Sequence, residues 1–141
     1  MGSEMCIRDR NRFGPLAGRT LIALIFLMSG AAKVAGFAGT VGYIASKGLP
    51  VPAAAAVLAI IAELGGGLLL IIGWQTRIAA AVLVVFTFFA AVLFHDFWAV
   101  SADQMQNTLI HFMKNISMMG GLLYVVIHGA GPLSVDASKR R

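Results

Sequence analysis

The sequence predicts an all-α membrane protein: a bundle of four transmembrane helices. Of the 141 residues, 59% are hydrophobic and only 12% are charged, about half of the roughly 25% charged residues of a typical soluble domain. The mean hydropathy is +0.86. The apolar residues also gather in four separate segments, each near the roughly 20 residues that cross a bilayer core. The surface of this chain therefore suits lipid and not water.

The four apolar segments are 16–34, 52–72, 77–94 and 108–127. Residues that favour turns or helix ends separate them. Pro52 suits a first helical turn, the Gly-Trp-Gln-Thr stretch at 73–76 makes a tight turn, and the Gly-Ala-Gly-Pro stretch at 129–132 ends the fourth segment. The first segment has an alternative interpretation as a cleaved signal peptide, because basic residues precede it and Ser29-Gly30-Ala31 resembles a cleavage site.

The segment 36–51, between the first two spans, is moderately apolar and contains several glycines. It is too short and too polar to cross a bilayer. We expect a short amphipathic helix lying in the membrane interface.

The chain divides into three parts. Residues 1–11 are predicted to be a non-native or disordered leader, residues 12–135 a single four-helix transmembrane domain, and residues 136–141 a basic cytoplasmic tail. The single cysteine, Cys6, lies in the leader, so the chain can form no internal disulfide and has no redox-active cysteine pair.

The basic residues predict the orientation. With four spans, both termini and the short loop with Arg77 share one side, which holds most of the Arg and Lys residues; the other side holds only Lys33 and Lys47. Basic residues favour the cytoplasmic side. We therefore expect a multi-pass protein of a bacterial inner membrane with both termini cytoplasmic. The same distribution explains the net charge of +5 without a nucleic-acid partner.

Glu63 lies near the middle of the second span, where a charged side chain costs about 2.5–3.5 kcal/mol on insertion scales. The same helical line carries Ala59 and Gly67, small residues that let another helix approach closely. Glu63 is therefore expected to face protein. Two interpretations stay open: a carboxylate that locks helix packing, and a carboxylate that belongs to a ligand site.

The other polar groups of the spans are predicted to converge in the outer half of the bundle. Thr108, His111, Lys114 and Asn115 fall within an arc of about 120° on the fourth helix. Lys33 ends the first span and His95 ends the third. We expect a polar pocket with Glu63 at its floor. The candidate ligand-binding residues are Lys33, Glu63, His95, His111, Lys114 and Asn115.

These residues also allow other interpretations. A di-iron site needs Glu-x-x-His repeats, which are absent from the sequence. A bis-histidine haem needs facing imidazoles at matching depth; His95 and His111 are both expected near the outer face, but close to the loop. A zinc site from His95, Asp96 and His111 lacks a diagnostic spacing, so no metal is predicted. Lys33 and Lys114 could also extend to the lipid head groups without forming a pocket.

Several short motifs carry a resemblance to a known family. They are Gly30-x-x-Lys33, Gly48-Leu-Pro50, Glu63-x-x-Gly66-Gly67, Gly73-x-x-x-Arg77, His95-Asp-Phe-Trp98, Phe112-Met-Lys114-Asn115 and Gly120-Gly121. In this order and spacing, over residues 12–135, they resemble the DoxX family. The resemblance implies a small four-helix inner-membrane protein; some relatives are subunits of thiosulfate:quinone oxidoreductases and others associate with oxidative-stress machinery. Lys33, Glu63, Arg77, His95 and Asn115 match recurring polar positions of the family.

The expected function is that of a subunit or accessory of redox or quinone-linked metabolism, not an enzyme on its own. Its pocket would bind a small ligand, either a quinone head group or a sulfur oxyanion; a quinone is the candidate cofactor. The expected partners are the lipid bilayer and either another subunit or a second copy. The alternatives are a small-molecule transporter and a non-catalytic membrane scaffold for a partner enzyme.

Overall fold

The computed structural model describes residues 2–139, which form six α-helices and no strand. Arg140 and Arg141 of the predicted basic tail, and Met1 of the predicted leader, lie outside the described residues. The helices are α1 (Gly2–Ala35), α2 (Phe37–Ser46), α3 (Pro52–Ile72), α4 (Thr76–Phe94), α5 (Ala102–His128) and α6 (Val135–Ser138).

Within residues 2–139, the four helices α1, α3, α4 and α5 are long and apolar enough to cross a membrane. This confirms the predicted four-helix membrane bundle, and α2 confirms the short helix predicted between the first two spans. α3 has the predicted bounds, and α4 begins one residue before the predicted span. α5 begins six residues before its predicted span, because Ser101 and the polar residues after it continue the helix beyond the apolar part. Residues 2–11 are helical and continue α1.

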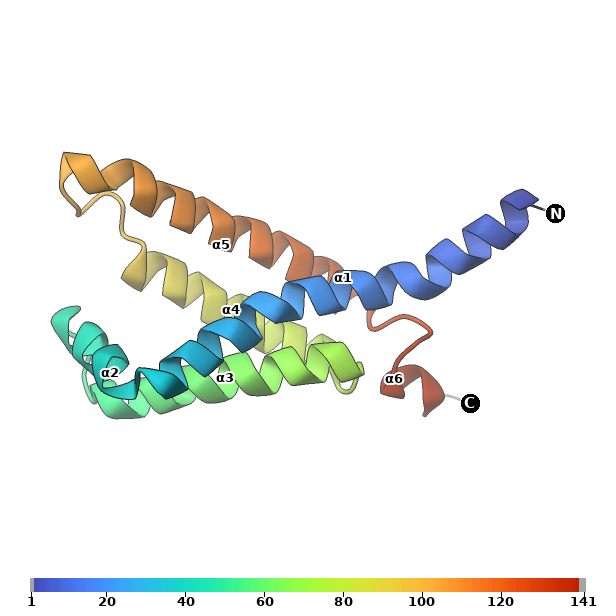
Figure 1. Cartoon of the computed structure of the whole chain (residues 1–141), viewed down its shortest axis with the longest axis horizontal. Helices are drawn as coiled ribbons and strands as arrows, with labels where there is room; N and C mark the ends of the chain where they lie inside the picture. Colours follow the sequence, from blue (N-terminus) through green and yellow to red (C-terminus); the bar gives the residue numbers. More distant parts are fainter. Residues whose placement is uncertain (1, 140–141) are drawn as a thin grey trace.

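The four long helices form two antiparallel pairs, α1 with α3 and α4 with α5, and the pairs join through α3 and α4. Figure 1 shows the pairs diverging toward the end that carries α2, while both chain termini lie at the opposite end. We call these the α2 end and the terminal end. α1 and α5 meet where Ile22 packs over Gly121, since a methyl group on that glycine would lie 2.9 Å from Ile22 Cδ1.

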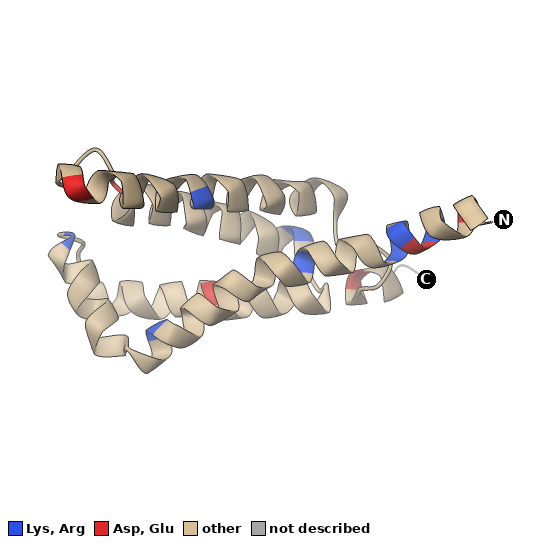
Figure 2. Cartoon of the chain, turned by 45° about the horizontal axis from the view of Figure 1, so that its top comes forward, with Lys and Arg blue, Asp and Glu red and all other residues tan. Residues whose placement is uncertain are grey.

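The buried apolar core fills the half of the bundle nearer the terminal end. Its members come from all four long helices: Ala23, Phe26, Leu70, Ala80, Leu83, Leu122 and Val125. Most other large apolar side chains of these helices are exposed, as expected of a surface that contacts lipid tails. Figure 2 shows few charged residues along the middle of the helices and several basic ones at the terminal end. The α2 end is therefore the half in which polar groups have room to gather.

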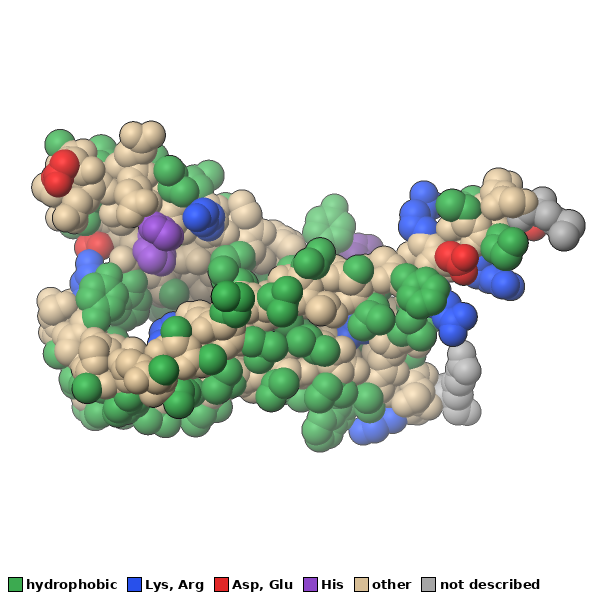
Figure 3. Space-filling view, in the orientation of Figure 1, with side chains coloured by type: hydrophobic (Ala, Val, Ile, Leu, Met, Phe, Trp, Pro, Cys, Tyr) green, Lys and Arg blue, Asp and Glu red, His purple; other side chains and the backbone are tan. Residues whose placement is uncertain are grey.

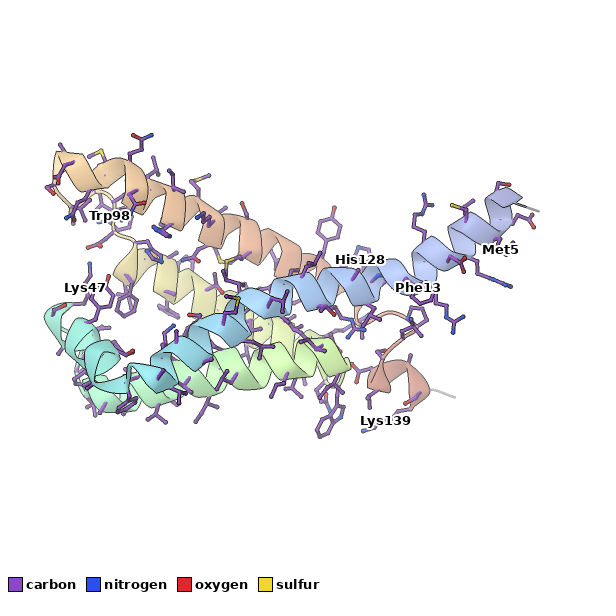
Figure 4. The ribbon with its side chains drawn as sticks, viewed as in Figure 1. Met5, Phe13, Lys47, Trp98, His128 and Lys139 are labelled. Atoms are coloured by element: carbon purple, nitrogen blue, oxygen red, sulfur yellow. The ribbon has the colours of Figure 1, made fainter. Side chains whose placement is uncertain are left out.

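Two contacts join α2 and the residues after it to the far end of α4. The Tyr43 ring lies 5.5 Å from the Phe94 ring, measured between centroids, and Lys47 Nζ lies 2.7 Å from Asp96 Oδ1. Figure 4 shows Lys47 and Trp98 at the α2 end of the molecule. These contacts link the two helical pairs at the end where the pairs diverge.

The terminal end is held by the chain after α5. The carboxylate of Asp136 accepts hydrogen bonds from the backbone N–H groups of Gln75 and Thr76, at 2.9 Å each, and from the Thr76 hydroxyl at 2.7 Å. These N–H groups begin α4 and have no partner within the helix. The predicted basic tail therefore begins with a helix, α6, that caps the start of α4.

Candidate functional site

Lys33 and Glu63 form an ion pair between α1 and α3. Lys33 Nζ lies 3.0 Å from Glu63 Oε1 and 2.9 Å from Oε2. Ser29, one turn before Lys33, donates to Glu63 Oε1 at 3.0 Å and accepts from Lys33 Nζ at 2.6 Å. The Glu63 side chain is 5% exposed and the Lys33 side chain 28%. The carboxylate is thus buried and held by two donors, while the ammonium remains partly accessible.

Glycine on α1 makes this pairing possible. A methyl group on Gly30 would lie 3.2 Å from Glu63 Cβ and 2.8 Å from Leu64 side-chain atoms, so α1 and α3 approach closely there. Because residues four apart share one face of a helix, Ser29 and Lys33 both reach the carboxylate. Lys33 and Glu63 are the two predicted site residues joined most directly.

His95 and His111 form a second polar group on the other helical pair. His95 caps α4 and His111 lies in α5; their rings stack with centroids 5.4 Å apart and an interplanar angle of 19°. Burial is the main cause that lowers the pKa of His95, and the neighbouring charges of His111 and Lys47 lower it further, while Asp96 raises it. The Lys47 ammonium in turn lowers the pKa of Asp96 by hydrogen bonding. His95 therefore favours its neutral form, which has one donor and one acceptor nitrogen.

Asn115 lies one turn from His111 along α5 and is buried, at 9% exposed. Its Nδ2 has no hydrogen-bond partner among residues 2–139, and the buried Thr87 hydroxyl of α4 has none there either. A buried unpaired donor costs roughly 1–3 kcal/mol. Asn115 is therefore a donor that an additional molecule could satisfy.

Lys114 differs from its neighbour. Its side chain is exposed, and it makes no ion pair or hydrogen bond within the described part of the chain. One residue along a helix turns the direction by about 100°, which separates Lys114 from the buried face that holds Asn115. Its exposure leaves open the alternative in which this lysine extends to the lipid head groups.

A hollow lies between the two helical pairs toward the α2 end. Figure 3 shows the surface hollowed there between α1 and α5, with histidine and basic side chains beside the hollow. No hydrogen bond or ion pair within residues 2–139 joins Lys33 or Glu63 to His95, His111 or Asn115. We call this hollow the lateral cleft.

Three polar residues of the structure were missing from the predicted site. Ser29 completes the Lys33–Glu63 group, and Lys47 and Asp96 tie α2 to the α4–α5 loop. The position of Ser29, four residues before Lys33, was a usable signal. The pairing of Lys47 with Asp96 was not predictable from spacing, because it depends on how α2 folds back. In residues 2–139, no three His, Cys, Asp or Glu side chains converge as a metal site would require.

Comparison with known proteins agrees with this fold. The DoxX family profile matches residues 14–96, more than half of the chain, from α1 to the end of α4. The chain belongs to the DoxX family. Inner membrane protein YphA of Escherichia coli (strain K12) is 37% identical over 121 residues, covering 86% of each chain. Inner membrane protein YqjF of the same organism is 37% identical over 123 residues, covering 87% of this chain and 89% of that one.

More distant relatives are longer. The Surfeit locus protein 4 homolog of Schizosaccharomyces pombe is 28% identical over 134 residues, which cover 94% of this chain but 39% of that protein. No solved structure matches the chain. The four apolar spans and the bacterial relatives make this DoxX-family chain an integral inner-membrane protein. The family match includes Lys33, Glu63 and His95 and ends before His111 and Asn115.

Proposed function

We propose that this protein binds the head group of a lipid-soluble quinone in the lateral cleft, as a membrane subunit or accessory of quinone-linked redox metabolism. The observation that carries the proposal is the placement of hydrogen-bonding groups on both sides of a hollow that opens between two membrane-spanning helices. On one side is Lys33 with Glu63, and on the other are His95 and His111. A lipid-soluble molecule could enter this hollow from the bilayer between α1 and α5.

The residues suit a ring with an oxygen at each end. Lys33 Nζ donates to Ser29 Oγ and to both carboxylate oxygens of Glu63, and its side chain is partly exposed, so a ligand oxygen would take the place of one carboxylate oxygen. His95 and His111 supply donors on the opposite side, and Asn115 Nδ2 is a buried donor without a partner among residues 2–139. The site therefore offers separate donors to two ligand oxygens. A quinone, when bound, supplies two-electron redox chemistry that no side chain of this protein supplies.

The protein's own groups can hold and move protons. Glu63 is buried beside the Lys33 ammonium, and the two side chains form an ion pair. His95, whose pKa is lowered by burial, favours its neutral form, in which one ring nitrogen can accept a proton and the other can donate one. The chain has one cysteine, so electrons would have to come from a partner protein. Another subunit that carries a redox centre is therefore part of the proposal.

Tryptophan fluorescence can test the binding. The chain has two tryptophans; Trp98 packs edge-on against Phe97 near His95, whereas Trp74 lies in the α3–α4 turn. In a Trp74→Phe background, we expect decylubiquinone to quench Trp98 saturably in the purified full chain. A charged hydrogen bond contributes about 1.5–3 kcal/mol, so Lys33→Gln should weaken binding about 10-fold or more. His95→Gln should also weaken it.

The matched control is Arg12→Gln, which removes an exposed charge at the terminal end and should leave binding unchanged. If Lys33→Gln does not fold, His95→Gln provides the test alone. Unsaturable quenching in the parent protein, or equal affinity in the parent, Lys33→Gln and His95→Gln, would contradict the proposal. That result would favour the scaffold alternative, in which the polar groups only fix the helices.

A further inference from the structure

The terminal end carries a pocket that the proposed function does not use. Its volume is about 630 Å³, and it lies between the α3–α4 turn, the end of α5 and α6. Figure 4 shows His128 and Lys139 at this end of the molecule. Its lining includes Gln75, Arg77, His128, Gly129, Asp136 and Lys139. We call it the terminal pocket.

Within residues 2–139, two cations of the terminal pocket have no anionic partner. The Arg77 guanidinium lies against Gly129, since a methyl group on that glycine would be 3.2 Å from Arg77 Nε and 3.5 Å from Nη2. Arg77 makes no ion pair or side-chain hydrogen bond within residues 2–139. Lys139 Nζ lies 5.0 Å above the centroid of the Trp74 ring and has no carboxylate partner in the same described part of the chain. Both charges are thus available to an added anion.

The carboxylate of the pocket is already engaged. Asp136 Oδ1 accepts from the Gln75 N–H, and Oδ2 accepts from the N–H and hydroxyl of Thr76. These bonds direct its charge at the first turn of α4. With two cations and one carboxylate, the pocket has a net positive charge before any contribution from His128. A guanidinium can bind two phosphate oxygens at once, so the chemistry of the pocket suits a phosphate anion.

The rim of the pocket carries exposed apolar and aromatic side chains. Ile78 and Ile127 are exposed beside it, as are Trp74 and Tyr124. The Tyr124 ring stacks on His128 with centroids 5.6 Å apart. Tryptophan and tyrosine concentrate at the level of the lipid head groups. A molecule with a phosphate for the pocket and hydrocarbon chains for this rim would match both surfaces.

We propose that the terminal pocket binds the phosphodiester head group of an anionic phospholipid, with Arg77 and Lys139 contacting the phosphate and the acyl chains lying against the exposed surfaces of α4 and α5. Basic pockets between membrane helices are suited to such head groups. Binding here would hold α6 and the α3–α4 turn together at the membrane surface.

Native mass spectrometry of the full chain in detergent can test this. The probes are dioleoyl phosphatidylglycerol, dioleoyl phosphatidylethanolamine with the same acyl chains, and inorganic phosphate. We expect phosphatidylglycerol to bind most tightly. Removing one cation near a membrane surface should weaken its binding about fivefold. Arg77→Gln and Lys139→Gln should each show that loss, and the double variant should lose about 25-fold. Arg77→Lys keeps the charge but not the two-oxygen contact, so its loss should be smaller than that of Arg77→Gln.

Arg10→Gln is the matched control, since it removes an exposed charge from the terminal end outside the pocket lining. It should bind phosphatidylglycerol as the parent does. Equal losses in Arg10→Gln and Arg77→Gln would show attraction to overall charge and overturn the site. Equal binding of phosphatidylethanolamine would overturn the anionic selectivity, and equal binding of inorganic phosphate would overturn a lipid ligand. If Arg77→Gln does not fold, Lys139→Gln decides the question.

Discussion

Arg19 Nη2 donates a hydrogen bond to the Leu133 carbonyl oxygen at 2.7 Å, across 114 positions of sequence. Nη1 of the same side chain donates to the carbonyl oxygens of Leu70 and Ile71. Those two carbonyls belong to the last turn of α3, where no backbone partner remains within the helix. A cation there also complements the helix dipole. Arg19, 1% exposed, thus joins α1, the end of α3 and the chain after α5.

Replacing Arg19 should destabilise the bundle. Arg19→Gln removes a buried charged donor and leaves carbonyl groups of three residues less well satisfied, so we expect the free energy of unfolding to fall by about 2–3 kcal/mol. Unfolding titrations in SDS–detergent mixtures can measure the change. Arg12→Gln, an exposed position on the same helix, should stay within about 0.5 kcal/mol of the parent. Equal stabilities of the two variants would show that the Arg19 contacts contribute nothing.

Gly66 and Gly65 are neighbours on α3 that should respond oppositely to alanine. A methyl group on Gly66 would lie 2.8–2.9 Å from three atoms of the Leu83 side chain, which is fully buried, whereas one on Gly65 would meet nothing within 4 Å. We expect Gly66→Ala to cost about 1–3 kcal/mol through overpacking. Gly65→Ala should be neutral or stabilising by up to about 1 kcal/mol, because alanine favours helix. The same titrations compare them; a stable Gly66→Ala would mean that α3 and α4 can separate easily.

The spans were predictable because hydropathy reports contact with lipid, and the four long helices are mostly exposed apolar surface. Reliance on hydropathy also limited the prediction of where α5 begins. Residues 102–107 are mostly polar, yet they extend the helix to its N-cap, Ser101, since backbone hydrogen bonding does not stop where the hydrocarbon region stops. Residues 2–11 were predicted as a leader, and the structure continues α1 through them.

The candidate site was predictable only where a charged side chain had to be buried and therefore needed a partner. Glu63 in mid-span required one, and Lys33 supplies it. Arg19 shares a helical line with Ala23, Phe26 and Gly30, which are the other buried residues of α1, so periodicity contained the signal for its burial. The sequence analysis counted Arg19 only among the basic residues on the side of both termini. Contacts that depend on how loops fold back, such as Lys47 with Asp96, need tertiary structure.

The orientation in the membrane stays a prediction, with both termini cytoplasmic because the basic residues gather at the terminal end. Ala102 and Ser138 are exposed at opposite ends of the bundle. In a Cys6→Ser background, Ala102→Cys should react with a membrane-impermeant maleimide added to intact cells, and Ser138→Cys should react only after lysis. The reverse pattern would invert the orientation.

The Lys33–Glu63 pair should show strong energetic coupling. Lys33→Met leaves a buried carboxylate without its cation, and we expect a loss of about 3 kcal/mol, since breaking a buried pair is costly. The double variant Lys33→Met/Glu63→Leu should recover much of that loss, because an apolar pair of similar size often replaces an ion pair at little cost. Lys114→Met, on an exposed lysine, should change little. If the stability losses of Lys33→Met and Glu63→Leu simply add up in the double variant, the two residues do not couple.

His95 should make the stability of the protein depend on pH. Burial first, and then the charges of His111 and Lys47, lower the pKa of His95 from its ordinary value of 6.5. Below about pH 6.5 the unfolded chain therefore takes up a proton that the folded chain resists. Stability should fall as the pH drops from 6.5 to the lower pKa of the folded state, and stay constant above that window. The lowered pKa of Asp96 affects stability only in more acidic solution, below about pH 4.

Melting temperatures measured between pH 5 and 8 would give the slope of stability against pH. His95→Gln should remove most of this slope, and His111→Gln should reduce it. The control is His128→Gln, at an exposed position, which should leave the slope unchanged. An equal slope in His95→Gln and the parent would assign the pH dependence to other groups.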